Sequence, residues 1–163
     1  MRKSRDEVLF IEEQKFRQPI LVIAIGLIIA IEGGFSIYFM LYRSLIEGIF
    51  SFSIALIICL SLLNIKLITK VRYDGLYTRF FPFPGSKIPL ADLVSYKAIT
   101  YSPIKDYGGW GYRVSLLKKT KAYNVSGNEG VKLEYSNGKH ILIGSQKAKK
   151  LEKAIKELLD NNK

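Results

Sequence analysis

Two long apolar stretches dominate the first 65 residues of the chain. Residues 20–42 contain a single ionisable side chain, Glu32, and residues 48–65 contain none. As helices rising about 1.5 Å per residue they would measure roughly 34 Å and 27 Å, close to the roughly 30 Å hydrocarbon core of a bilayer. The intervening stretch, residues 43–47, is short. We therefore predict an antiparallel transmembrane hairpin over residues 19–66.

Small residues recur at every fourth position of both stretches and predict how the two helices pack. Small faces allow close backbone approach, which favours helix association in lipid. With about 100° per residue, Glu32 points away from the small face of the first helix, so we expect it to face lipid or protein. It is then either a glutamate tolerated in lipid or a contact with a second copy or another membrane protein. The predicted packing residues are Gly26, Ala30, Gly34, Ser51, Ala55 and Cys59.

Residues 1–18 form a separate lead segment in this interpretation. Ser4 and Glu7 have capping-box spacing, and apolar residues follow at helical steps, which predicts a short amphipathic helix on the membrane surface. Basic residues gather before the first stretch and after the second, whereas the connection between them carries only Arg43. The positive-inside rule therefore predicts an integral cell membrane protein with both termini in the cytoplasm.

Residues 67–163 change to β-branched and aromatic runs punctuated by turn residues, which is typical of antiparallel sheets. The pair Asn137-Gly138 predicts a type I′ hairpin turn. Ser145 is a plausible N-cap for an amphipathic C-terminal helix whose apolar face contains Ala148, Leu151, Ile155, Leu158 and Leu159. The predicted strands are 67–73, 76–81, 93–100, 110–117, 122–125, 131–135 and 141–143.

Seven strands followed by one amphipathic helix resemble the order of pleckstrin-homology-like (PH-like) domains. The segments DGLYTRFFPF, DYGGWGYR and AYNVSGNEGVKLEYSNGKHILIGSQ, preceded by a two-span hairpin, resemble a family of small prokaryotic membrane proteins with such a domain. The resemblance implies an α+β fold: a transmembrane helical hairpin, then a seven-stranded antiparallel barrel or sandwich with a C-terminal helix. It implies no catalytic or ligand-binding residues.

The charge of the chain and its few reactive residues limit the classes of function that the protein can have. The net charge is +11, and residues 66–163 carry 19 basic against 8 acidic side chains. Such a surplus binds nucleic acid phosphates or an anionic leaflet. The predicted membrane anchor favours the anionic leaflet over nucleic acid as the partner of these basic residues, and no nucleic-acid motif is visible. One cysteine, Cys59, and one histidine, His140, cannot assemble a metal site, and no cofactor motif is present, so we expect neither metal nor cofactor.

A glycine-rich segment near the middle of the second part carries candidate contact residues. One of its aromatic side chains packs in a core under the simpler interpretation. The alternative is a contact for a peptide or a lipid headgroup. Its candidate residues are Lys105, Tyr107, Trp110 and Arg113.

Three phenylalanines follow the second apolar stretch closely. Phe80, Phe81 and Phe83 could touch the bilayer interface, although one of the first two should point into a core.

The expected function is a non-enzymatic binding module held at the cytoplasmic membrane surface, acting on a protein or an anionic lipid. A second hypothesis is a subunit of a larger membrane complex assembled through the helices, and the sequence also allows a homo-oligomer. A hydrolytic enzyme would require His140 beside a nucleophile in an open pocket.

Overall fold

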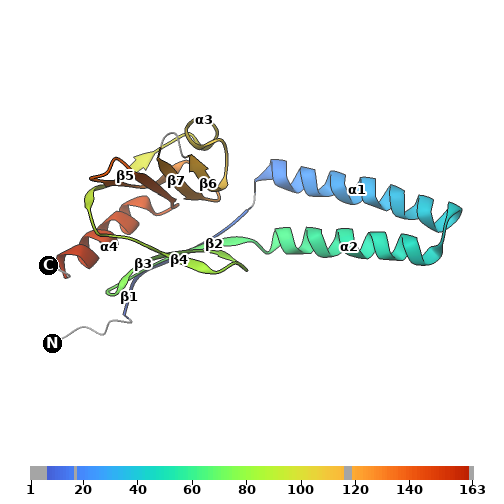
Figure 1. The fold of residues 1–163 in the computed structure, drawn as a ribbon, viewed down its shortest axis with the longest axis horizontal. Coiled ribbons are helices and arrows are strands. Elements are labelled where there is room, and N and C mark those ends of the chain that lie inside the picture. Colours follow the sequence, from blue (N-terminus) through green and yellow to red (C-terminus); the bar gives the residue numbers. More distant parts are fainter. Residues whose placement is uncertain (1–6, 17, 116–118, 162–163) are drawn as a thin grey trace. The chain divides into compact units, whose positions relative to one another are not determined.

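The computed structural model describes residues 7–16, 18–115 and 119–161. The fold is α+β: two apolar helices, two mostly antiparallel sheets and a C-terminal helix (Figure 1). It divides into two compact units. One is the helical segment Phe16–Ile65, and the other combines the chain up to Lys15 with the chain from Lys66 onward. The predicted fold class is correct at this level.

The helical unit is a hairpin with a very short connection. Helix α1 (Pro19–Tyr42) begins with proline at its first turn, where the missing N–H costs nothing. Helix α2 (Leu45–Leu63) is capped by Ser44, whose hydroxyl accepts a hydrogen bond from the backbone N–H of Ile46 at 3.2 Å. Since α2 begins at Leu45, the connection is shorter than the predicted five residues.

The contact face of α2 consists of small residues. Cys59 is only 1% exposed, and Ser51 and Ala55 are half-buried. Gly48 extends this face by one turn: a Cβ atom there would lie 2.7 Å from the backbone oxygen of Ser36 on α1. Glycine at position 48 therefore permits the closest approach of the two helices.

The contact face of α1 differs from the predicted one. Ser36 is only 3% exposed, whereas Gly26, Ala30 and Gly34 are exposed. A Cβ atom at either of those glycines would have no described neighbour within 4 Å. The contact lies instead on the face of Glu32 and Ser36, four residues apart. Polar groups that hydrogen-bond across helices compete with small residues for such a contact, and here the polar stripe faces the partner.

The first sheet begins with a strand where the sequence predicted a helix. Strand β1 (Val8–Lys15) pairs antiparallel with β2 (Lys66–Arg72), across the whole helical hairpin. Along β1, Phe10, Glu12 and Gln14 are buried and their neighbours more exposed, so the pattern has the period of two of a strand. Ser4, half of the predicted capping box, lies outside the described residues. Strands β3 (Gly75–Phe81) and β4 (Gly85–Ile88) complete the order β1-β2-β3-β4.

The second sheet has the order β5-β8-β9-β7-β6, and its β7–β9 pair is parallel. A short helix, α3 (Pro103–Tyr107), follows β5, and α4 (Ala148–Asp160) ends the fold. The strands are β5 (Leu93–Thr100), β6 (Gly111–Ser115), β7 (Thr120–Asn124), β8 (Glu129–Tyr135) and β9 (His140–Gly144).

All seven predicted strands are present, but their assembly differs from the prediction. With β1 and β4, the described residues form nine strands in two separate sheets rather than a closed seven-stranded barrel. Residues 116–117, predicted as the end of the fourth strand, lie outside the described residues. The β8–β9 hairpin also has another turn: Gly138 has φ 75° and Asn137 is not among the residues with positive φ, which excludes type I′.

Helix α4 closes the core by packing on strands of both sheets. Leu151, Ile155 and Leu158 are fully buried, as the amphipathic pattern predicts. The N-cap is Lys147 rather than the predicted Ser145. The Ser145 hydroxyl instead accepts from the N–H of Lys147 at 3.0 Å and donates to the buried Glu12 carboxylate of β1. The first strand is therefore bonded to the start of the last helix.

Candidate functional site

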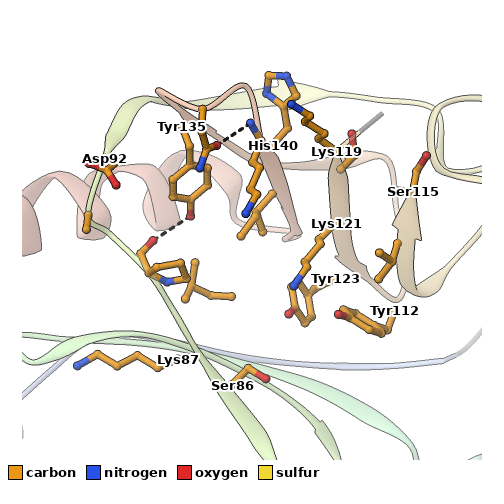
Figure 2. Close-up of a pocket in the computed structure, with 18 residues that line it drawn as sticks. Ser86, Lys87, Asp92, Tyr112, Ser115, Lys119, Lys121, Tyr123, Tyr135 and His140 are labelled. Atoms are coloured by element: carbon orange, nitrogen blue, oxygen red, sulfur yellow. Dashed lines mark hydrogen bonds between the residues drawn. The ribbon is translucent and has the colours of Figure 1, made fainter. Parts of the chain in front are cut away.

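A pocket of about 670 Å³ lies among β4, the segment that follows it, and strands β6, β7 and β9. Its volume is within the range of about 300–1,000 Å³ found for small-molecule sites. Figure 2 shows Tyr112, Lys121 and Tyr123 on one wall, pointing toward the strand that carries Ser86 and Lys87. The pocket belongs entirely to the β-rich unit.

Tyrosines form the apolar part of the pocket. The ring centres of Tyr112 and Tyr123 lie 5.0 Å apart, and Phe80 stacks on Tyr123 with a centre-to-centre distance of 6.4 Å. The Tyr135 hydroxyl donates to the carbonyl oxygen of Pro89 at 2.9 Å, which fixes the segment after β4 against β8 (Figure 2). The aromatic wall is therefore held by packing and one hydrogen bond across the two sheets.

Two of the pocket tyrosines, Tyr123 and Tyr135, have raised pKa values. Burial, with a contribution from Tyr123, raises the pKa of Tyr135 to about 12. Burial and the neighbouring Tyr112 also raise the pKa of Tyr123. The Tyr135 hydroxyl already donates its proton to Pro89, whereas the neutral phenol of Tyr123 can donate a hydrogen bond to a bound anion.

Cations outnumber acids around this pocket. The described lining includes Lys119, Lys121 and Lys139, and its acidic member is Asp92. Lys87 also lines it, but its ammonium lies 5.6 Å from the centre of the Tyr77 ring, which is not part of the lining. With its tyrosines and lysines, the pocket has the chemistry to hold a small anionic group.

His140 lines the same pocket, yet its ring nitrogen faces a carboxylate. Its Nδ1 atom lies 3.8 Å from Glu134, and Lys132 binds the same carboxylate oxygen at 2.7 Å. The hydrogen bond and charge of Lys132, aided by His140, lower the pKa of Glu134. Within the described part of the chain, no three His, Cys, Asp or Glu residues gather in a way that could hold a metal ion.

The structure brings together three of the four residues predicted around the glycine-rich segment. Lys105, Tyr107 and Arg113 line a second hollow of about 270 Å³ beside α3, and Trp110 is not part of its lining. Tyr107 packs edge-on against Tyr101 at 5.5 Å, and burial raises its pKa. Core packing was the simpler interpretation for Trp110 or Tyr112, but Trp110 is half-buried and Tyr112 is 50% exposed, so neither belongs to the buried core.

Glu32 does not point away from the partner helix. The Ser51 hydroxyl of α2 donates to its carboxylate at 3.4 Å, and Glu32 is half-buried. The exposed glutamate expected from the small-residue stripe is replaced by a polar contact within the hairpin.

The larger pocket was missed by sequence reasoning. Alternation along β6 and β7 places Tyr112 with Val114, and Lys121 with Tyr123, on single strand faces. The sequence therefore contained the signal for this wall of the pocket. The approach of β4 depends on contacts between distant segments, which the sequence pattern does not contain.

Segments Val22–Tyr42 and Leu45–Leu63 of α1 and α2 are long and apolar enough to cross a membrane, with mean hydropathies of 2.1 and 2.3. Most of their side chains are exposed, unlike those of a core helix in a globular protein. Comparisons with protein-family models, curated proteins and solved structures gave no match.

Proposed function

We propose that the protein is a membrane-anchored, non-enzymatic binding module with a PH-like domain, acting at the cytoplasmic membrane surface. The hairpin holds the β-rich unit beside the lipid, and the pocket lined by Tyr112, Lys121 and Tyr123 binds an anionic group. The observation that carries the proposal is this pocket, basic and tyrosine-lined, in a chain that also exposes two long apolar helices.

The membrane part of the proposal rests on the exposure of apolar side chains on α1 and α2 and on the pairing of β1 with β2. Exposing the many Ile, Leu and Phe side chains on the surface of α1 and α2 to water would be strongly unfavourable. Because β1 pairs directly with β2, the chain enters and leaves the hairpin on one side of any bilayer it spans. Lys15, Lys66, Lys70 and Arg72 lie close to the ends of the hairpin, and lysine and arginine near the ends of a span favour the cytoplasmic side.

The ligand part rests on the shape and charge of the pocket. A concave site of this volume fits a headgroup-sized molecule better than the flat surface of a folded protein. Lysines and neutral tyrosine hydroxyls donate hydrogen bonds to phosphate oxygens. An anionic lipid headgroup is therefore the favoured ligand, and an acidic protein segment is the alternative.

Calorimetric titration of the full chain in nanodiscs of zwitterionic lipid tests this assignment. The probes are dihexanoyl phosphatidylglycerol, its zwitterionic phosphatidylcholine counterpart and glycerol 1-phosphate. Comparing the first probe with glycerol 1-phosphate distinguishes binding of a lipid from binding of a free phosphate ester. We expect the anionic lipid to bind, and Lys121→Met to weaken binding about fivefold, since one cation near lipid phosphates contributes about 1 kcal/mol.

Lys97→Met is the matched control, because Lys97 is exposed on β5 and does not line the pocket. Equal affinities of the two variants, or equal binding of the two lipids, would contradict the assignment.

The alternative of a complex assembled through the helices rested on an outward-facing Glu32. Its contact with Ser51 removes that argument. The hypothesis rested also on the small-residue faces, and Gly26, Ala30 and Gly34 are exposed, so such a complex stays a prediction.

A further inference from the structure

The sheet β1-β2-β3-β4 has two faces of opposite character. On one face, Leu67, Val71 and Leu76 are fully buried. The alternate positions point the other way, and six of them are basic. We call this surface the basic face; its basic and aromatic members are Lys15, Lys66, Lys70, Arg72, Tyr77, Arg79, Phe81 and Lys87.

Strand register makes the basic face continuous across all four strands. Ile11 of β1 pairs with Lys70, Lys70 with Tyr77, and Tyr77 with Lys87 of β4. A shallow hollow of about 320 Å³ lies on this face. Lys70, Arg79 and Lys87 are exposed, and Ile11 is 51% exposed.

The cations of this face gather around two aromatic rings. Arg72 and Lys87 lie 5.0 and 5.6 Å from the centre of Tyr77. Arg79 and Lys66 lie 5.4 and 5.7 Å from the centre of Phe81. Such contacts favour a cation over the ring face.

Two acids lie beside these cations. Glu13 is bound by Lys66 at 2.7 Å, and Asp74 by Arg72 at 3.2 Å. Among the described residues, the six cations of the face therefore exceed its acids by four.

The covalent chain ties one end of this face to the apolar helices. Lys15 and Lys66, the last residue of β1 and the first of β2, are register partners. Three residues separate Lys15 from Pro19, and two separate Leu63 from Lys66. At no more than about 3.6 Å per residue, each helix end lies within roughly 15 Å of this sheet edge. Phe81 pairs with Lys66 and is 39% exposed, so an aromatic side chain occupies the same edge.

We infer that the basic face lies against the anionic lipid leaflet and orients the β-rich unit on the membrane. This inference rests on the membrane anchoring in the proposed function. Lipid is the favoured occupant because a net positive face bearing aromatic side chains is tethered within a short chain length of the bilayer. Phe81 and Ile11 then contact the interfacial region, and the arginines and lysines contact lipid phosphates. Lys87 lines the pocket as well as belonging to this face, whereas Lys121 lines the pocket and is not part of the face.

Tryptophan quenching by lipids brominated near the headgroup tests this orientation. The full chain carries Trp110→Phe, leaving one introduced tryptophan, and is placed in nanodiscs with or without phosphatidylglycerol. We expect strong quenching of Ile11→Trp in anionic discs and weak quenching in phosphatidylcholine alone. Val94→Trp, on β5 and 70% exposed, is the control position and should be quenched in neither.

Charge substitutions then test whether the basic residues of this face cause the orientation. Lys70→Gln with Arg79→Gln, at two exposed positions of the face that do not line the larger pocket, should lower the ratio of docked to undocked domain about thirtyfold, since each cation near an anionic leaflet contributes about fivefold. Lys97→Gln with Lys153→Gln removes two exposed cations from other surfaces and should leave the quenching of Ile11→Trp unchanged.

Phe52→Trp in α2, measured with lipids brominated near the ends of their acyl chains, separates the two proposals, because Phe52 lies well inside this helix. If Phe52→Trp is quenched while Ile11→Trp behaves like Val94→Trp, the inferred orientation is overturned and membrane anchoring stands. If Phe52→Trp is not quenched by lipid, the anchoring fails, and the orientation fails with it.

Discussion

Replacing Glu12 should destabilise the β-rich unit far more than replacing its neighbour Glu13. Glu12 is 7% exposed, and its carboxylate accepts hydrogen bonds from the Ser145 hydroxyl and from the backbone N–H of Gln146, the latter at 3.0 Å. Ser145 is only 1% exposed, so water cannot readily replace the lost partner. This contact joins β1 to the start of α4, which are more than 130 residues apart in the chain.

The magnitude follows from these two bonds. A hydrogen bond to a charged group contributes about 1.5–3 kcal/mol, and the loss of two is partly offset because the carboxylate no longer has to leave water. We expect Glu12→Ala to cost roughly 3 kcal/mol. For a domain of about 100 residues this lowers Tm by about 12–24 °C. Glu12→Gln keeps one acceptor oxygen and should cost less than Glu12→Ala.

Thermal unfolding of the full chain in detergent, followed by near-ultraviolet circular dichroism, measures this effect. Glu13→Ala is the control, because Glu13 is exposed and only pairs with Lys66 at the surface. Equal Tm values for Glu12→Ala and Glu13→Ala would refute the assigned role of Glu12 in joining β1 to α4.

Three further predictions test the hairpin, the pocket and the topology. Gly48→Leu should push the helices apart and speed alkylation of the buried Cys59 by N-ethylmaleimide in micelles. Gly26→Leu is the control and should not change the rate, because a side chain at position 26 has open space around it. Equal alkylation rates in the two variants would contradict the described contact face. Because the pKa of Tyr135 is about 12 in the fold and about 10 in the unfolded chain, its contribution to stability should be lost as pH rises from about 10 to about 12. Tyr135→Phe should make that alkaline decline in Tm shallower, and an unchanged slope would count against the assignment. Protease added to sealed right-side-out vesicles should leave residues 66–163 intact and should digest them in inverted vesicles; the reverse pattern would place the domain outside the cell.

The strands of the second part were predictable because their signals are local. Turn residues such as Gly127 and Gly138, both with positive φ, interrupt alternating apolar runs and define the strands directly. The face of α4 was also readable, since Leu151, Ile155 and Leu158 repeat at helical spacing and are all buried.

The structure of the lead segment could not be derived from its own sequence. Both a helical and an alternating pattern can be found in residues 8–15, and pairing with β2 decides between them. That partner lies about 50 residues away, beyond the helical hairpin, so local periodicity does not contain the answer.

The same limit explains the error at Glu32 and the missed pocket. Small residues and polar residues both define a stripe on α1, and the choice depends on the partner helix, where Ser51 meets Glu32. The pocket wall of Tyr112 and Tyr123 becomes a cavity only where β4 of one sheet approaches β6 and β7 of the other.

The pairing of β1 with β2 couples synthesis of the sheet to insertion of the helices. β1 leaves the ribosome first, but its partner strand is made only after both helices. If a single helix crossed the bilayer, the two strands would emerge in different compartments and the edge of β2 would remain unpaired. If the helices span a membrane as proposed, a native β-rich unit therefore reports that β1 and β2 lie on the same side of it.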